Sequence, residues 1–187
     1  MTQIPSSLGN SAEAEKVLRP AALWAAACAG LALAIFEGKQ PRDTRPRDAI
    51  KAGEAFGRGS PRDRMLRTLA WAAQSAAKES GSEAAKYAAR SAMLAAAVAY
   101  THTDVNIGKQ GVGQARHLLG PAVYAALACE VATQKQAGVA DGVLQTAANT
   151  APQEVGILLQ HFPRQPQGTT RLSQLFYDLD TRLRLLL

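Results

Sequence analysis

The chain has 187 residues, of which 47% are hydrophobic and 5% aromatic, with a formal net charge of +6. This length suits one domain with a substantial core, and this composition excludes a disordered or fibrous protein. Alanine dominates the hydrophobic fraction, which favours closely packed helices because alanine buries little area and has the best helix propensity. Two cysteines are too few for a disulfide scaffold, so Cys28 and Cys129 are expected to be buried thiols in a reducing, cytoplasmic compartment.

Residues 1–10 are polar and are expected to form a flexible tail before a single helical domain over residues 11–187. The domain is expected to open with a helix at Ser11, and Pro20 fits the first turn of a second helix that ends at Gly38. Segment 21–36 is uncharged, but its 16 residues fall short of the roughly 20 that span a bilayer. We therefore expect a buried central helix and no membrane partner.

Turn and capping residues delimit the next helices. One helix is expected over 46–56, and Ser60 is expected to cap another that ends near Ser80. A further helix is expected to begin at Ser82 and to run to about Tyr100. The helix after Ser60 carries an apolar stripe that predicts its buried face, formed by Met65, Leu66, Leu69, Ala73 and Ala76.

Segment 101–113 contains three glycines and is expected to be a flexible connection, since it lacks the residue order of a phosphate loop. A helix resumes near Gln114, and Pro121 either kinks it or divides it in two. Three more helical segments are expected over 139–149, 152–162 and 170–187. The prediction is an all-α protein, an antiparallel helical bundle or stacked helix pairs, with roughly seven to eight helices.

The positive charge is concentrated in one stretch of the sequence. Nine basic and four acidic residues lie within residues 39–67. A local positive field favours an acidic partner, although such a stretch can also be a solvated face whose charges pair with each other. Arg45 and Arg47 flank a proline at an expected helix start, where arginine opposes the helix dipole. Carboxylate partners are therefore expected, either on another protein or internal, at Glu37, Asp43 or Asp48.

Few residues indicate a chemical site. His102, Asp104 and His117 could supply metal ligands to a hydrolase, but no two histidines have the helical spacing of a zinc site. Neither cysteine has a neighbour that would activate it as a nucleophile beside His117. We therefore expect no enzyme and no cofactor. The aromatic residues within helices are expected to fill the core, unless one or two are exposed as interface anchors: Trp24, Trp71, Tyr87, Tyr100 and Tyr124.

Three blocks of the sequence resemble one known family. A run over 23–29 that includes Trp24 and Cys28 precedes the block Arg45-Pro46-Arg47, and an alanine-rich helix pair over 68–100 follows before His117. This order is similar to the Imm5-like family of bacterial immunity proteins over roughly residues 18–133. The resemblance implies a protein that neutralises a co-produced toxin and carries no catalytic residues.

The leading hypothesis is a non-enzymatic protein-binding module, an immunity protein that occludes a toxin in a stoichiometric complex. Inhibitors of nuclease toxins are often acidic, whereas this chain is basic, so its partner is expected to present an acidic or an apolar surface. The alternatives are a nucleic-acid-binding protein that uses the basic stretch 39–67, or a metal-dependent hydrolase; a homodimer is also open. The residues expected to bind the partner are Arg42, Arg45, Arg47, Arg62 and Arg64.

Overall fold

The computed structural model describes residues 12–101 and 108–185, which form eight α-helices and one short 3-10 helix without any strand. The expected tail over residues 1–10, together with His102 and Asp104, lies outside this described part. The helices, in chain order, are α1 (Ala12–Lys39), α2 (Arg45–Gly57), α3 (Arg64–Glu79), α4 (Glu83–Ala97), η1 (Val98–Tyr100), α5 (Gly108–Ala132), α6 (Val139–Thr150), α7 (Gln153–Gln160) and α8 (Arg171–Leu185).

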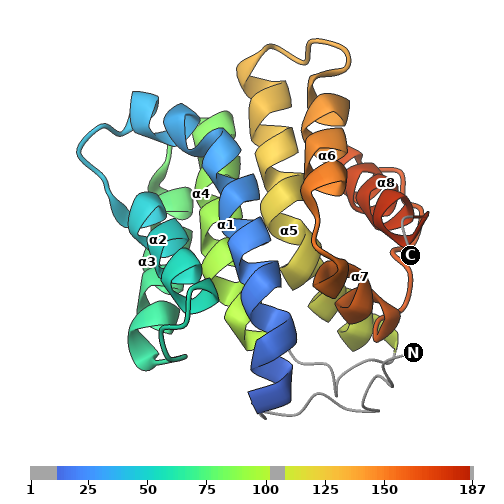
Figure 1. The fold of residues 1–187 in the computed structure, drawn as a ribbon. Coiled ribbons are helices and arrows are strands. Elements are labelled where there is room, and N and C mark those ends of the chain that lie inside the picture. The colour runs from blue at the N-terminus through green and yellow to red at the C-terminus, as the bar shows by residue number, and fades with distance from the viewer. Residues whose placement is uncertain (1–11, 102–107, 186–187) are drawn as a thin grey trace.

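Three helices, α1, α4 and α5, pack against one another in the middle of the protein (Figure 1). On one side α2 and α3 pack against α4, and α2 also packs against α1. On the other side α6 and α8 pack against α5, and α7 packs against α1 and α8. The prediction of an all-α helical bundle with seven to eight helices is confirmed.

Alanine and glycine allow these helices to approach closely. Gly53 of α2 lies so near α4 that a Cβ atom there would come within 2.8 Å of the Ala95 carbonyl oxygen. At Gly120 of α5, a Cβ atom would overlap the side chain of Leu94 from α4. A larger side chain at Gly53 would push against the backbone of α4 and separate two helices, which is costly in a close-packed interior, whereas at Gly120 it would first displace the end of the Leu94 side chain.

Two prolines lie inside helices, although Pro20 was expected to begin a second helix and Pro121 was expected either to kink its helix or to divide it in two. Pro20 is within α1, which is a single helix and not the expected two, and Pro121 is within α5. A proline inside a helix removes one backbone hydrogen bond. Both helices are buried in the core on each side of their proline, which offsets that loss; the fully or nearly fully buried neighbours are Leu18, Ala21, Ala22, Leu118, Leu119, Ala122 and Val123.

Two expected helix starts are also wrong. Helix α3 is capped by Asp63 and not by Ser60, because the Asp63 carboxylate accepts a hydrogen bond from the Leu66 amide at 3.1 Å. The backbone of Ser60 is held instead by the end of α2, through its amide, and by the guanidinium of Arg19, through its carbonyl. Helix α5 begins at Gly108, six residues before Gln114, so part of the glycine-rich segment is helical. The expected start at Ser82 is confirmed.

Helix α1 is central, but one of its faces is open to solvent. Its segment Ala14–Lys39 is long and apolar enough to cross a membrane, and half of an apolar stretch of 18 residues within it is buried inside the fold. The buried face includes Trp24, whose indole N–H donates to the Ala147 carbonyl at 2.9 Å. The exposed face consists of small and aliphatic residues: Leu23, Ala27, Gly30, Leu31 and Ala34. The expectation of a buried central helix therefore holds for one face of α1 and not for the other.

Candidate partner-binding site

The five arginines expected to bind a partner lie in two separate places. Arg42, Arg45 and Arg47 lie where α1 meets α2, whereas Arg62 and Arg64 lie between α2 and the start of α3. Helix α2 has 13 residues, which corresponds to a length of about 20 Å. The end of α3 returns to the start of α2, where Glu79 pairs with Arg45, so the start of α3 lies at the far end of α2. The structure therefore does not bring the five side chains together.

We call residues 39–47 the α1–α2 corner; here arginines are paired with carboxylates of the same chain. The Arg45 guanidinium donates to Asp43 at 2.7 and 2.9 Å and to Glu79 at 2.6 Å. Arg47 donates to Glu37 at 2.7 Å. These hydrogen bonds lower the pKa values of the three carboxyl groups below their ordinary range.

The internal alternative therefore accounts for two of the corner arginines. The carboxylate of Asp48, a third expected partner, accepts a hydrogen bond from the Thr44 hydroxyl at 2.8 Å. Arg42 is exposed and makes no hydrogen bond or ion pair with any residue that the structure describes. At the corner, therefore, only the exposed guanidinium of Arg42 lacks a partner among the described residues, whereas Arg45 and Arg47 are paired with carboxylates.

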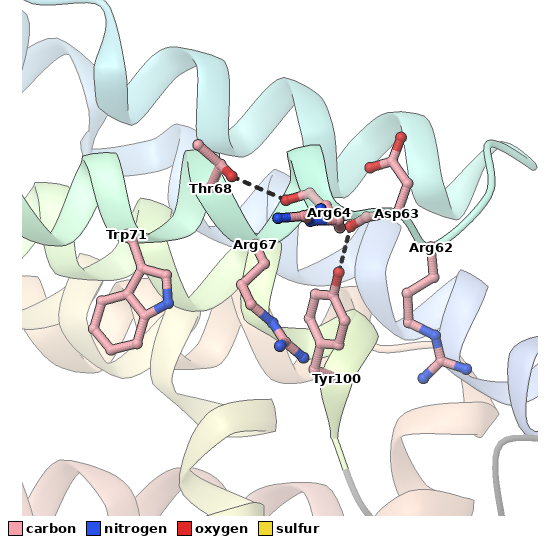
Figure 2. A pocket seen from close by; sticks show the side chains of 7 residues that line it. All are labelled: Arg62, Asp63, Arg64, Arg67, Thr68, Trp71 and Tyr100. Atoms are coloured by element: carbon pink, nitrogen blue, oxygen red, sulfur yellow. Dashed lines mark hydrogen bonds between the residues drawn. The ribbon is translucent and has the colours of Figure 1, made fainter.

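The other group of arginines lines a surface hollow that we call the α3 groove. Its residues are Arg62, Asp63, Arg64, Arg67, Thr68, Trp71 and Tyr100, and its volume is about 440 Å³ (Figure 2). Arg64, Arg67 and Trp71 are spaced i, i+3 and i+7 along α3, so they share one face of the helix. Tyr100, at the end of η1, forms the opposite wall.

Hydrogen bonds inside the molecule hold the floor of the α3 groove. The Tyr100 hydroxyl donates to the Asp63 carbonyl at 2.5 Å (Figure 2). The Asp63 carboxylate accepts from the Leu66 amide and caps α3. Arg62 donates to the Ala99 carbonyl at 3.0 Å and lies 3.8 Å from the Glu15 carboxylate. Arg62 is half-buried, so it supports the wall between α1, η1 and α3 and offers little free charge.

Arg64, Arg67 and Trp71 are the open side chains of the α3 groove. Neither arginine forms an ion pair within the described residues, and the Arg67 guanidinium lies 4.7 Å from the centre of the Tyr100 ring. Trp71 is 65% exposed, whereas the second tryptophan, Trp24, is only 4% exposed. An exposed indole beside two unneutralised guanidiniums can bind an apolar group and an anionic group at the same time.

The expected stripe on α3 is partly wrong, and the error conceals this groove. The buried residues of α3 are Leu66, Ala70, Ala73, Ala76 and Ala77. Met65, which was placed on the buried stripe, is exposed. Trp71 lies off both the expected and the observed stripe, and that position is the signal that would have identified it as an exposed anchor, together with Arg67.

The described residues offer little for catalysis. Burial raises the pKa of the Cys28 thiol to about 12 and also raises that of Cys129, so neither free thiol is an activated nucleophile. Burial lowers the pKa of His161. Within residues 12–101 and 108–185 no three His, Cys, Asp or Glu side chains gather as a metal site. His117 is exposed on α5, and its suggested companions His102 and Asp104 fall outside the described residues.

Comparison with known proteins gives one match. A family model described as "Imm-5 like putative immunity protein" matches residues 14–107, half of the chain. The matched range contains α2, α3 and α4, most of α1, and every residue of the α1–α2 corner and of the α3 groove. No curated protein and no solved structure matches the chain.

Proposed function

The chain belongs to the Imm-5 like family of immunity proteins, and from this premise we propose that it neutralises a toxin by stoichiometric binding, without catalysing a reaction. The observation that carries the proposal is the exposure of Trp71 in the α3 groove, because most other large apolar side chains of the described residues are buried. Tryptophan and arginine are the residues most enriched among those that dominate binding energy at protein interfaces. The groove combines both on one helical face.

The mechanism we propose is occlusion. A toxin surface covers the α3 groove, the indole of Trp71 is removed from water, and Arg64 and Arg67 gain carboxylate partners. Charge complementarity speeds association and fixes orientation, while the buried aromatic contact slows dissociation. We place this complex in the cytoplasm, because both cysteines are free thiols, as a reducing compartment maintains them.

One observation also favours a second candidate, nucleic-acid binding. Exposed tryptophan beside arginine is the arrangement on which single-stranded bases stack, with guanidiniums near the phosphates. Such binding weakens steeply with salt, because each neutralised phosphate releases counterions. A toxin complex anchored by Trp71 retains an apolar contribution at high salt.

The test begins with capture of partners by the tagged protein from lysate of its producing cells, at low and at high salt, with mass spectrometry and a nucleic-acid stain. The captured toxin is then purified, and its activity is titrated with the untagged chain. Stoichiometric inhibition predicts a linear loss of toxin activity that ends at one chain per toxin. A toxin that is inactivated by far less than one equivalent would show that the chain is an enzyme and would overturn the proposal.

A further inference from the structure

We propose that the α3 groove receives an acidic segment of the toxin, in which two neighbouring carboxylates on one face pair with Arg64 and Arg67 and an apolar side chain covers Trp71. This inference rests on the proposed function and specifies its contact. It assigns to the toxin a chemical pattern that can be searched for on the surface of the captured protein.

The spacing of the pattern follows from the geometry of α3. Arg64 and Arg67 are three residues apart, about 4.5 Å along the helix axis, and Trp71 lies about 6 Å further. Two carboxylates at i and i+4 of a helix, or at i and i+2 of a strand, are separated by roughly 5–7 Å. Either element can therefore present both acids to the two guanidiniums and place its next apolar residue over the indole.

The α3 groove has two arginines without an internal carboxylate partner among the described residues, so a carboxylate that pairs with them would come from another molecule. The one acid that lines it, Asp63, directs its carboxylate to the Leu66 amide at the start of α3. Arg62 has the Ala99 carbonyl and the Glu15 carboxylate as its own partners. Arg64 and Arg67 remain without an ion pair in the described part of the chain, and guanidinium pairs best with a carboxylate in two parallel hydrogen bonds.

A short acidic segment fits the groove better than a nucleic-acid strand, because the positive surface is not continuous. A strand of nucleic acid requires a basic track that follows its backbone over several nucleotides. The next arginine of the basic stretch, Arg58, is paired with Glu54. Arg45 and Arg47 lie about one length of α2 away and are already paired with Asp43, Glu79 and Glu37. The two unpaired arginines of the groove lie within one turn of α3, which matches a local acidic contact.

The experiment measures the affinity of the full chain for the toxin captured above and, in parallel, for a 20-residue oligothymidylate. The groove variants are the double charge reversal Arg64→Glu/Arg67→Glu and the single variant Trp71→Ala. The matched control is Lys109→Glu/Arg164→Glu, which makes the same change in net charge at two exposed residues of the other half of the protein. Circular dichroism and thermal unfolding check that each variant is folded.

We expect the double reversal to lower toxin affinity by at least about 100-fold and Trp71→Ala to lower it by at least about 30-fold. The control stays within about threefold of the wild type, and oligothymidylate binding is weak for all four proteins. Reversal to lysine of the toxin acids that face the groove is expected to restore binding of the doubly reversed variant.

Three results would overturn the inference. If the groove variants bind and neutralise the toxin as the wild type does, the contact lies elsewhere while the proposed function stands. If Leu31→Glu, on the open face of α1, abolishes binding while the groove variants retain it, the toxin docks on α1. If the groove variants lose oligothymidylate binding and the wild type forms no toxin complex, both this inference and the proposed function fail.

Discussion

The two groups of arginines differ in what surrounds them, although they belong to one basic stretch of the sequence. At the α1–α2 corner, Arg45 and Arg47 each donate to carboxylates of the same chain. In the α3 groove, Arg64 and Arg67 lie beside an exposed tryptophan and have no such partner among the described residues. Charge counted along a sequence is therefore a poor guide to charge available at a surface, because a carboxylate within 3 Å removes most of it.

An internal carboxylate beside Arg64 would make the α3 groove resemble the α1–α2 corner. Thr68 is exposed in the groove, four residues after Arg64, so Thr68→Glu supplies an internal carboxylate at helical spacing. We expect toxin affinity to fall by about 100-fold, since the partner's carboxylates would meet a like charge and an already paired arginine. The measurement is isothermal titration calorimetry of the variant against the captured toxin.

Thr68→Gln is the control for this change, because it has nearly the same size as glutamate and no charge. Its affinity should remain close to that of the wild type. Equal losses in the two variants would mean that the side chain at this position acts by its bulk, and the contrast between groove and corner would lose its electrostatic explanation. The stability of both variants should stay within about 0.5 kcal/mol of the wild type, as for most exposed substitutions.

A smaller effect is expected from loosening the groove without changing its open charges. Asp63 caps α3, so Asp63→Ala removes the acceptor of the Leu66 amide. We expect a loss of about 1 kcal/mol in the free energy of unfolding, measured in urea. Asp63→Asn retains an acceptor and should recover most of the loss. If alanine is as stable as asparagine, the cap does not support the groove.

The sequence predicts helices more reliably than it predicts pairings. The helix over 46–56 was found because its apolar residues recur on one face, and its buried residues Ala49, Ile50, Gly53 and Phe56 confirm that stripe. The cap at Ser82 was found because a serine before an acidic residue is a local signal. The partner of Arg45 was missed in part because Glu79 is 34 residues away, and no local pattern reports such a contact.

The wrong helix boundaries in α1 and α5 have a common physical cause. Pro20, Gly111, Gly113 and Pro121 are local helix breakers, yet each lies inside a helix. Propensity costs about 1 kcal/mol for glycine and about 3 kcal/mol for proline, and burial of a long apolar face exceeds either. Which face is buried depends on helices distant in sequence, so the local signal gave the wrong boundary. The exposure of Trp71, by contrast, could have been predicted from the sequence, because Trp71 lies off the apolar stripe of its helix.

The corner should show its charge pairing in the pH dependence of stability. Asp43, Glu37 and Glu79 have pKa values lowered by hydrogen bonds from Arg45 and Arg47. A carboxyl group with a lowered pKa in the folded state contributes stability above its unfolded pKa, about 4, and that stability disappears as the pH falls through the folded value. We expect the double variant Arg45→Gln/Arg47→Gln to lose less stability than the wild type as the pH falls. The measurement is the urea midpoint of unfolding between about pH 6 and pH 2.5. Arg64→Gln/Arg67→Gln should leave this pH dependence unchanged, and an equal change in both would remove the contrast between the two groups.

The smallest expected effect reports the free charge of the groove directly. The chain has two tryptophans, and only Trp71 is open to quenchers in solution. Because Arg64 and Arg67 lie on the same face of α3, iodide should collect near the indole and caesium should avoid it, so iodide quenching should exceed caesium quenching by about twofold at low salt. Arg64→Gln/Arg67→Gln should abolish the difference, and so should 1 M salt, where the Debye length is about 3 Å. If the preference for iodide survives in this variant, the positive field at Trp71 comes from the protein as a whole, and the groove has no local charge to offer a partner.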